Sequence, residues 1–294
     1  MSRQLTEVLT REEAPALLLG NGVNRFWNED PLSWEHLLEH LAQNRGVALR
    51  PEELAEMSNT ELYDLLDLAK PHSEKEDLQV EVRNLMRSWK PTEVHEMIVA
   101  WAMRRAAPIM TVNFDQNLSE SHKLKLHVVK QNNFYPFHSH FARELVEDPL
   151  NSFGIWHPHG MIHFRQSIRL GLTHYMGSVQ RARAWMKDKR ALLNYADGRE
   201  HSWPGDRTWL QIILFKPLVI IGFGFGKDET FMRWLLLERA RLYETHPQLR
   251  KPCWFVDAQS PTFERRKAFL RGIGMTVIST DVHSDIYDAR GWRQ

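Results

Sequence analysis

Residues 218–236 read LVIIGFGFGKDETFMRWLL, and this stretch decides the fold. It begins with consecutive aliphatic residues, a continuous run typical of a strand that is buried on both faces. Gly222, Gly224 and Gly226 follow, and apolar residues at helical spacing begin beyond Asp228, whose carboxylate suits a helix N-terminus. A buried strand, a glycine turn and a helix in this order form the repeating unit of a parallel α/β sheet.

Other short apolar runs extend this pattern in both directions along the chain. We expect strands at 14–20, 108–113, 153–156, 254–258 and 275–280, in KLHVVK around Val128 and in IRLGLTH around Leu170. Helical patterns separate most of these runs, which favours right-handed crossovers between parallel strands. The sequence therefore predicts an α/β fold: a Rossmann-like parallel sheet with helices on both faces and a large helical insertion.

The 294 residues are expected to form a single domain. Its Rossmann-like core would comprise about 12–33 and 108–280. Between the first two strands, about 34–107 is far longer than the dozen or so residues that a crossover needs, so we interpret it as a helical insertion. A second helical segment is expected at about 177–215.

Charge is balanced overall, at +1, but not locally. The segment 52–96 holds 12 acidic against 5 basic residues, and 165–216 holds 10 basic against 4 acidic residues. Solvated helix faces would explain both segments. Alternatively, complementary surfaces meet in a homo-oligomer or with a partner protein, with Trp185, Trp203 or Trp209 exposed as anchors, or the two lobes face each other within one chain.

The composition indicates in which compartment the protein works and which ligands it does not bind. Cys253 is the single cysteine, which excludes an internal disulfide and a multi-cysteine zinc site and fits the reducing cytoplasm. The N-terminus has no apolar signal core, and the apolar runs are too short to span a bilayer. With no strong net field, we expect no membrane and no direct nucleic-acid binding.

Two motifs follow the first two expected strands. In GNGVN, Gly20 and Gly22 permit a tight turn and close approach of a phosphate to backbone amides, with Asn24 just beyond, although an ordinary strand-to-helix turn also explains them. In TVNFD, Asn113 and Asp115 lie at the carboxyl end of a strand, where ligands bind in open parallel sheets. Asn113 suits sugar hydroxyls or a water; Asp115 accepts from a ligand amide or caps the next helix.

A histidine cluster follows the next expected strand. His157, His159 and His163 stand in WHPHGMIH. A metal site is the weaker interpretation, because no carboxylate lies nearby in the sequence, and we expect no metal. A general base or a ribose-binding histidine beside a glycine turn is the better functional interpretation. A surface histidine is the structural alternative.

Taken in order, GNGVN, TVNFD, HPHG, GLTHY, GFGFGKDE and a late FVD resemble the SIR2-like (sirtuin-related) domain family, over roughly 14–280. Two features are similar to the divergent bacterial branch found in anti-phage defence proteins: GFGFGKDE followed by a helix, and Thr173-His174-Tyr175 after the His-Gly pair. The resemblance implies an NAD+ glycohydrolase, which cleaves NAD+ to nicotinamide and ADP-ribose and acts as an NAD-depleting effector. A partner protein such as an ATPase would also fit.

The same resemblance implies roles for individual residues. Asn113 and His159 would be catalytic, with His157 the competitor for His159, and Asp115 would hold the carboxamide. The remaining positions would bind the rest of NAD+: Gly20, Gly22 and Asn24 at the pyrophosphate and ribose, and Gly222, Phe223, Gly224 and Asp257 on the adenosine side.

Two departures from sirtuins weaken a deacylase assignment. The four-cysteine zinc lobe of protein-deacylating sirtuins is missing, since Cys253 stands alone, and the first turn continues as GVNRFWNEDPLSW rather than GIPDFR-like. An NAD-dependent deacylase or ADP-ribosyl transferase remains an alternative. A second is a non-catalytic module that senses NAD or ADP-ribose, and a third is a subunit that is inactive alone.

Overall fold

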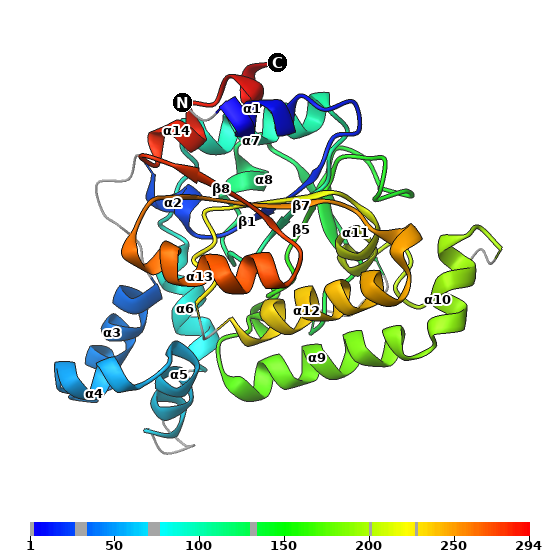
Figure 1. Cartoon of the computed structure of the whole chain (residues 1–294). Helices are drawn as coiled ribbons and strands as arrows, with labels where there is room; N and C mark the ends of the chain where they lie inside the picture. The colour runs from blue at the N-terminus through cyan, green and yellow to red at the C-terminus, as the bar shows by residue number, and fades with distance from the viewer. Residues whose placement is uncertain (1–2, 27–33, 70–76, 130–133, 200–201, 227–228) are drawn as a thin grey trace.

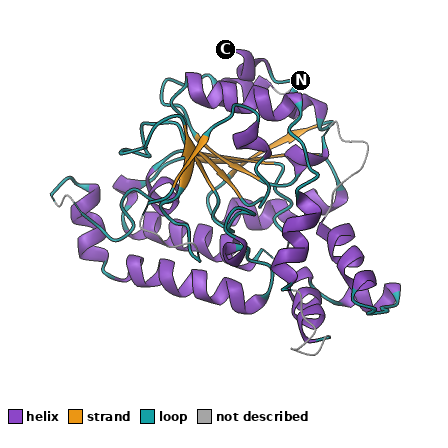
Figure 2. Cartoon of the chain, turned by 180° about the vertical axis from the view of Figure 1, so that it is seen from behind, coloured by secondary structure: helices purple, strands orange, loops and turns teal. Residues whose placement is uncertain are grey.

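The computed structural model describes residues 3–26, 34–69, 77–129, 134–199, 202–226 and 229–294. In this part of the chain, a sheet of eight strands lies between layers of helices, and most of its strands are parallel (Figures 1 and 2). The expected α/β, Rossmann-like fold is confirmed.

The sheet has the order β3-β4-β5-β2-β1-β6-β7-β8. Its strands are β1 (Ala16–Leu19), β2 (Ile109–Thr111), β3 (Lys125–His127), β4 (His140–Ala142), β5 (Ile155–Trp156), β6 (Leu218–Ile221), β7 (Cys253–Ala258) and β8 (Thr276–Thr280). Central β1 pairs in parallel with β2 and β6, and Leu19 faces both Thr111 and Ile221 in register. Near one edge of the sheet, β4 runs antiparallel to both of its neighbours, β3 and β5.

The helices of the first half of the chain are α1 (Arg3–Leu9), α2 (Gly22–Arg25), α3 (Trp34–Asn44), α4 (Pro51–Glu56), α5 (Asn59–Leu68), α6 (Leu78–Met86), α7 (Glu93–Arg104) and α8 (Asn117–Glu120). Those of the second half are α9 (Leu172–Lys187), α10 (Lys189–Ala196), α11 (Trp209–Phe215), α12 (Thr230–Thr245), α13 (Pro261–Gly272) and α14 (Ser284–Tyr287). Short 3₁₀ turns are η2 (Arg165–Ser167), η3 (Pro247–Leu249) and η4 (Arg290–Arg293).

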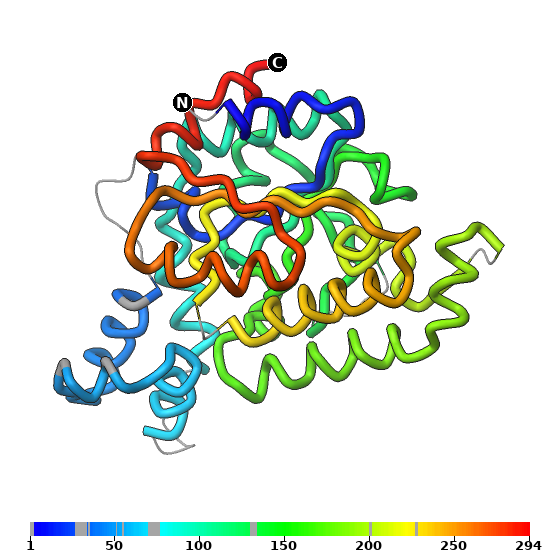
Figure 3. Tube along the Cα trace, viewed as in Figure 1, coloured from blue at the N-terminus to red at the C-terminus, as the bar shows by residue number. Residues whose placement is uncertain are grey.

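Alternate residues of each strand enter different cores, because successive side chains point to opposite faces of a sheet. Leu18 packs in a cluster with residues of α9, α11, α12 and α13. Leu17 and Leu19 pack in a second cluster with residues of α1, α7 and η4. Both faces are therefore covered, which explains why the strands are continuously apolar. Figure 3 shows the two chain ends near each other, where α1 contacts η4.

Helices α3, α5 and α6 contribute most of a third cluster. Leu41 and Leu66 are fully buried in it, and Phe114 and Ile168 from the core loops join it. A buried ion pair reinforces the cluster, with Arg45 Nη2 2.5 Å from Glu81 Oε1. Helices α3, α5 and α6 thus pack against the loops at the carboxyl edge of the sheet, whereas α7 packs in the second cluster.

Three sequence-based expectations need correction. IRLGLTH is not a strand: α9 begins at Leu172, and Ile168 and Leu170 are apolar because they pack against the insertion helices. The prediction that Trp203 and Trp209 are exposed interface anchors is wrong, because the two residues are 4% and 1% exposed. Trp185 is half-buried and packs edge-on against Phe137. Strand β4 was not expected, because it is short and carries no apolar run.

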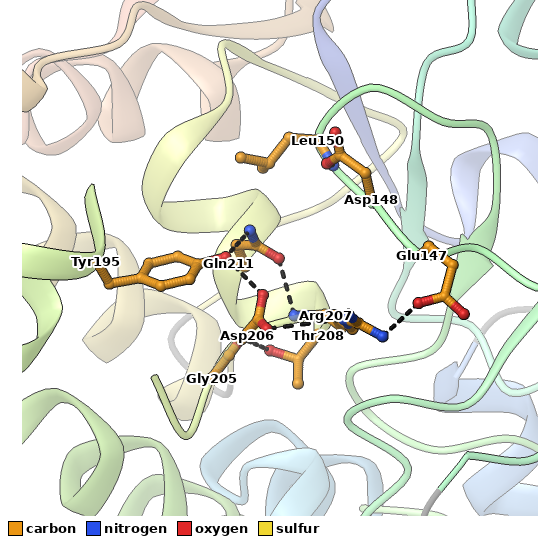
Figure 4. A network of polar contacts seen from close by, with 9 residues as sticks. All are labelled: Glu147, Asp148, Leu150, Tyr195, Gly205, Asp206, Arg207, Thr208 and Gln211. Carbon is orange, nitrogen blue, oxygen red and sulfur yellow. Dashed lines mark hydrogen bonds and ion pairs between the residues drawn. The ribbon is translucent and has the colours of Figure 1, made fainter. Parts of the chain in front are cut away.

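A polar network fixes the turn before α11 (Figure 4). Tyr195 Oη donates to Asp206 Oδ1 at 2.5 Å, and Gln211 Nε2 donates to Tyr195 Oη at 2.5 Å. Gln211 Oε1 accepts from the backbone amide of Arg207, whose φ is +56°, and the Arg207 guanidinium pairs with Glu147. These contacts hold α10 and α11 together. Within the described residues, no helix is long and apolar enough to cross a membrane.

Candidate functional site

The predicted site residues lie along the carboxyl edge of the sheet. Strand register brings the ends of β5, β2, β1 and β6 side by side. Gly20 follows β1, Asn113 follows β2, His157 follows β5 and Gly222 follows β6. Asp257 lies near the end of β7, one residue beyond the Val256 that pairs with Ile221. The strand order and register therefore place these residues at the edge where the sequence predicts them.

The two glycine turns touch each other directly. The Gly22 amide donates to Gly222 O at 2.8 Å, and the Gly20 amide donates to Ile221 O at 3.0 Å. A Cβ added to Gly20 would lie 2.4 Å from Phe223 Cα, and one added to Gly22 would lie 2.6 Å from Gly222 Cα. Contact between these two backbones therefore requires both glycines, whatever ligand binds there.

Asp257 lies at the β7 end of this region. Its carboxylate accepts from the Ala258 amide at 2.9 Å and lies 3.7 Å from His283 Nε2. Burial raises the pKa of Asp257, while its own hydrogen bond and His283 oppose that rise. Gly224, by contrast, is exposed, and a Cβ added to it would have no described atom within 4 Å. Asp228 lies outside the described residues.

Asn24 and Asp115 belong to a closed hydrogen-bond network. Asn24 Nδ2 donates to Asp115 Oδ2 at 2.7 Å, and the Asn117 amide donates to Asp115 Oδ1 at 3.0 Å. Asn24 Oδ1 accepts from Asn117 Nδ2 at 3.0 Å and contacts His95 Nε2 at 2.9 Å. Burial raises the pKa of Asp115, and the hydrogen bond from Asn24 opposes it. Asp115 thus serves the start of α8, the structural alternative considered above.

The network fixes the protonation of His95. Its Nδ1 accepts from the Thr92 amide at 3.0 Å, so the proton of the neutral ring lies on Nε2 and is donated to Asn24 Oδ1. Burial lowers the pKa of His95 to about 4. The neutral His95 of α7 therefore holds the side chain of Asn24 in place through this hydrogen bond.

Asn113 and His157 are joined through the backbone. His157 Nδ1 donates to Asn113 O at 2.9 Å, because a carbonyl oxygen can only accept. Burial lowers the pKa of His157 to about 4, so its ring is neutral at pH 7 with Nε2 as an acceptor. Asn113 Nδ2 donates to Gly20 O at 3.2 Å. Asn113 Oδ1 and His157 Nε2 are buried and have no partner among the described residues.

His159 is nearly inaccessible, at 2% exposure. Its Nε2 lies 3.0 Å from Glu229 Oε2, and its Nδ1 is buried without a partner in the described part of the chain. The loop that carries it is anchored beside Asn113 at two points, by the His157 bond and by the Ile162 amide, which donates to Phe114 O at 2.8 Å. The structure thus brings the loop that carries His159 beside the Asn113 segment.

A small cavity of about 50 Å³ lies beside His159. It is lined from the core by Val112, Phe114, His159, Leu170, Tyr175 and Glu229, and from the insertion by Trp34, Leu38, Asn59 and Thr60. The Trp34 and Phe114 rings meet edge-on at 4.9 Å. Helices α3 and α5 therefore cover the cavity next to His159.

Several residues of the site escaped sequence analysis. His95, Asn117 and Glu229 lie next to predicted residues in space, but His95 and Glu229 reach them across 71 and 70 positions of sequence. Asn117 was within reach, since it stands two positions after Asp115. Among the described residues, His, Cys, Asp and Glu side chains form no group of three or more that could hold a metal ion.

Comparison with known proteins adds no family: the sequence matches no protein-family model and no curated protein. The geometry of the carboxyl edge, with the motif resemblance, is therefore what bears on function.

Proposed function

We propose that this protein is a SIR2-like NAD+ glycohydrolase that cleaves NAD+ to nicotinamide and ADP-ribose. One observation carries the proposal. Asn113 and His159 follow adjacent parallel strands, and each has a buried side-chain polar atom, Oδ1 and Nδ1, with no partner in the described chain. Unpartnered buried polar atoms are costly, and in a native protein each is explained by strain, by a bound water or ion, or by a role in a reaction.

The chemistry asks little of the protein. The pyridinium of NAD+ is already a cationic leaving group, so the nicotinamide departs without a general acid. Charge then develops on the ribose, and water must be placed on its open face. Positioning and electrostatic support are the terms that matter for such a step.

The residues present match these needs. Asn113 Oδ1 accepts a hydrogen bond from the water or a ribose hydroxyl, and His159 Nδ1 takes the proton of the water. Asp115 retains accepting capacity after its bonds to Asn24 and Asn117, because each carboxylate oxygen accepts more than one hydrogen bond, and it is proposed to hold the carboxamide. Gly20, Gly22, Asn24, Gly222, Phe223, Gly224 and Asp257 are proposed to contact the remainder of NAD+.

The covered cavity constrains this proposal. About 50 Å³ is far below the 300–1,000 Å³ typical of ligand pockets, so we propose that side chains of α3 and α5 move away from the core when NAD+ binds beside His159. This supports the idea that the chain is restrained until a trigger or partner opens the site, as an NAD-depleting effector in anti-phage defence requires.

Assembly is part of the proposal. Within one chain, the acidic and basic segments already touch, because the Leu172 amide at the start of α9 donates to Asp64 Oδ2 of α5 at 3.1 Å. This favours, for these two helices, the alternative in which the lobes meet internally. We propose that other charged faces join copies of the chain or a defence partner.

Nicotinamide release by variants tests the proposed roles. Asn113→Ala and His159→Ala should each lower turnover by about 10²–10⁴-fold with unchanged thermal unfolding. His157→Ala is the competing variant, because His157 Nε2 is also a buried acceptor without a partner among the described residues. Wild-type turnover in His159→Ala, with activity lost in His157→Ala, would transfer the role to His157.

A further inference from the structure

Glu229 fixes which nitrogen of His159 carries the proton. A carboxylate only accepts hydrogen bonds, so at 3.0 Å His159 Nε2 must be the donor. In the neutral ring, the lone pair is then on Nδ1, the buried atom without a partner in the described chain. Glu229 is itself 24% exposed and lines the same cavity as His159.

The ring is held from its other sides as well. Tyr175 of α9 meets it edge-on at 5.3 Å, and Phe231, two residues after Glu229, lies at 6.1 Å. The backbone is fixed because His159 O accepts from the Arg169 amide at 3.0 Å. Gly160 follows with φ +95°, and a Cβ there would lie 2.0 Å from Ser167 O. The imidazole therefore has one orientation, and the Glu229 contact selects its tautomer.

Other charged groups near the ring point elsewhere. The Arg169 guanidinium stacks on Phe134 and Tyr135, at 4.3 and 4.5 Å. Arg233 of α12 stacks over Phe269 at 4.2 Å. Among the described residues, the rings of Tyr175 and Phe231 and the Glu229 carboxylate lie against the imidazole, and of these three groups Glu229 carries the charge.

We propose that Glu229 is a positioning residue that holds His159 with Nδ1 as the proton acceptor and stabilises the imidazolium formed during turnover. This inference rests on the proposed glycohydrolase function. Water oxygen bonds to the anomeric carbon as the glycosidic bond breaks, and that electron pair leaves with nicotinamide. The water proton passes to Nδ1 and is later released to solvent, so NAD+ and water yield nicotinamide, ADP-ribose and one proton. A carboxylate that orients a histidine in this way resembles the arrangement of hydrolase triads.

The test compares Glu229→Gln, Glu229→Asp and the control Glu238→Gln. Glu238 lies on α12, which Glu229 directly precedes, and it pairs with Arg241. Nitrogen NMR of histidine-labelled protein, assigned with His159→Ala, reports the His159 tautomer without any turnover. Wild type should show the proton on Nε2, Glu229→Gln should lose that preference, and Glu229→Asp and Glu238→Gln should keep it.

Kinetics supply the second readout. In Glu229→Gln, kcat for nicotinamide release should fall by about 10²–10³-fold with KM within about threefold. Glu229→Asp should recover at least part of kcat. An unchanged tautomer in Glu229→Gln, or a wild-type kcat with an altered tautomer, would overturn the inference. A tautomer change in Glu229→Gln, together with a wild type that releases no nicotinamide, would support the pairing and overturn the glycohydrolase.

Discussion

Lowering the pH from 7 to 4 should destabilise this protein through His95. The ring must be neutral, because Nδ1 accepts from the Thr92 amide while Nε2 donates to Asn24. Burial lowers the pKa of His95 from 6.5 to about 4. The unfolded chain therefore binds the proton first as the pH falls, so stability is present above about 6.5 and is lost toward 4. The difference corresponds to roughly 3 kcal/mol.

Urea unfolding of wild type and His95→Gln at pH 7, 6, 5 and 4 measures this term. A glutamine amide still donates to Asn24 Oδ1 but does not titrate. His157 is also buried with a pKa of about 4, and it contributes equally to both proteins. The stability advantage of wild type over His95→Gln should shrink by about 3 kcal/mol between pH 7 and 4. The exposed His163→Gln serves as control. Parallel pH dependences in wild type and His95→Gln would refute the neutral-histidine network.

Two further predictions follow from the turns and the charge pattern. Gly20→Ala should lower the free energy of unfolding by about 2–4 kcal/mol, because its Cβ would lie 2.4 Å from Phe223 Cα. Gly224→Ala has open space around its Cβ and should lower it by less than about 1 kcal/mol. Equal losses in denaturant unfolding would contradict the backbone contact. Light scattering should find an oligomer at low salt that dissociates and loses activity at high salt; a strict monomer with full activity at low salt would remove assembly from the proposal.

Local chemistry explains why so much of the fold was predictable. The run 218–221 is apolar at every position because both faces of β6 are covered, and the same holds for β1, so each strand was recognisable alone. Ile168 and Leu170 were misleading for the same reason: burial by the insertion helices gives a loop the composition of a strand. Strand β4 gave no signal, since its three residues include the polar His140.

The site was predictable only in part, for a different reason. Glycines and polar residues at strand ends mark the carboxyl edge from sequence, because parallel register brings those ends together. The residues that form hydrogen bonds with these side chains have no comparable signal in the sequence. His95 on α7 reaches Asn24, and Glu229 before α12 reaches His159, through contacts that the tertiary fold alone creates. The tautomers of both histidines follow from those partners, so sequence could place His159 but not orient it.

Product balance after incubation with NAD+ tests the central claim most directly. Purified protein, in its assembled form and with no acyl-peptide added, should release nicotinamide and ADP-ribose in equal amounts, and His159→Ala should release neither above background. Tight NAD+ binding without nicotinamide would leave a sensing module instead. Nicotinamide release only with an acylated peptide, or without matching free ADP-ribose, would contradict hydrolysis and indicate deacylation or ADP-ribosyl transfer.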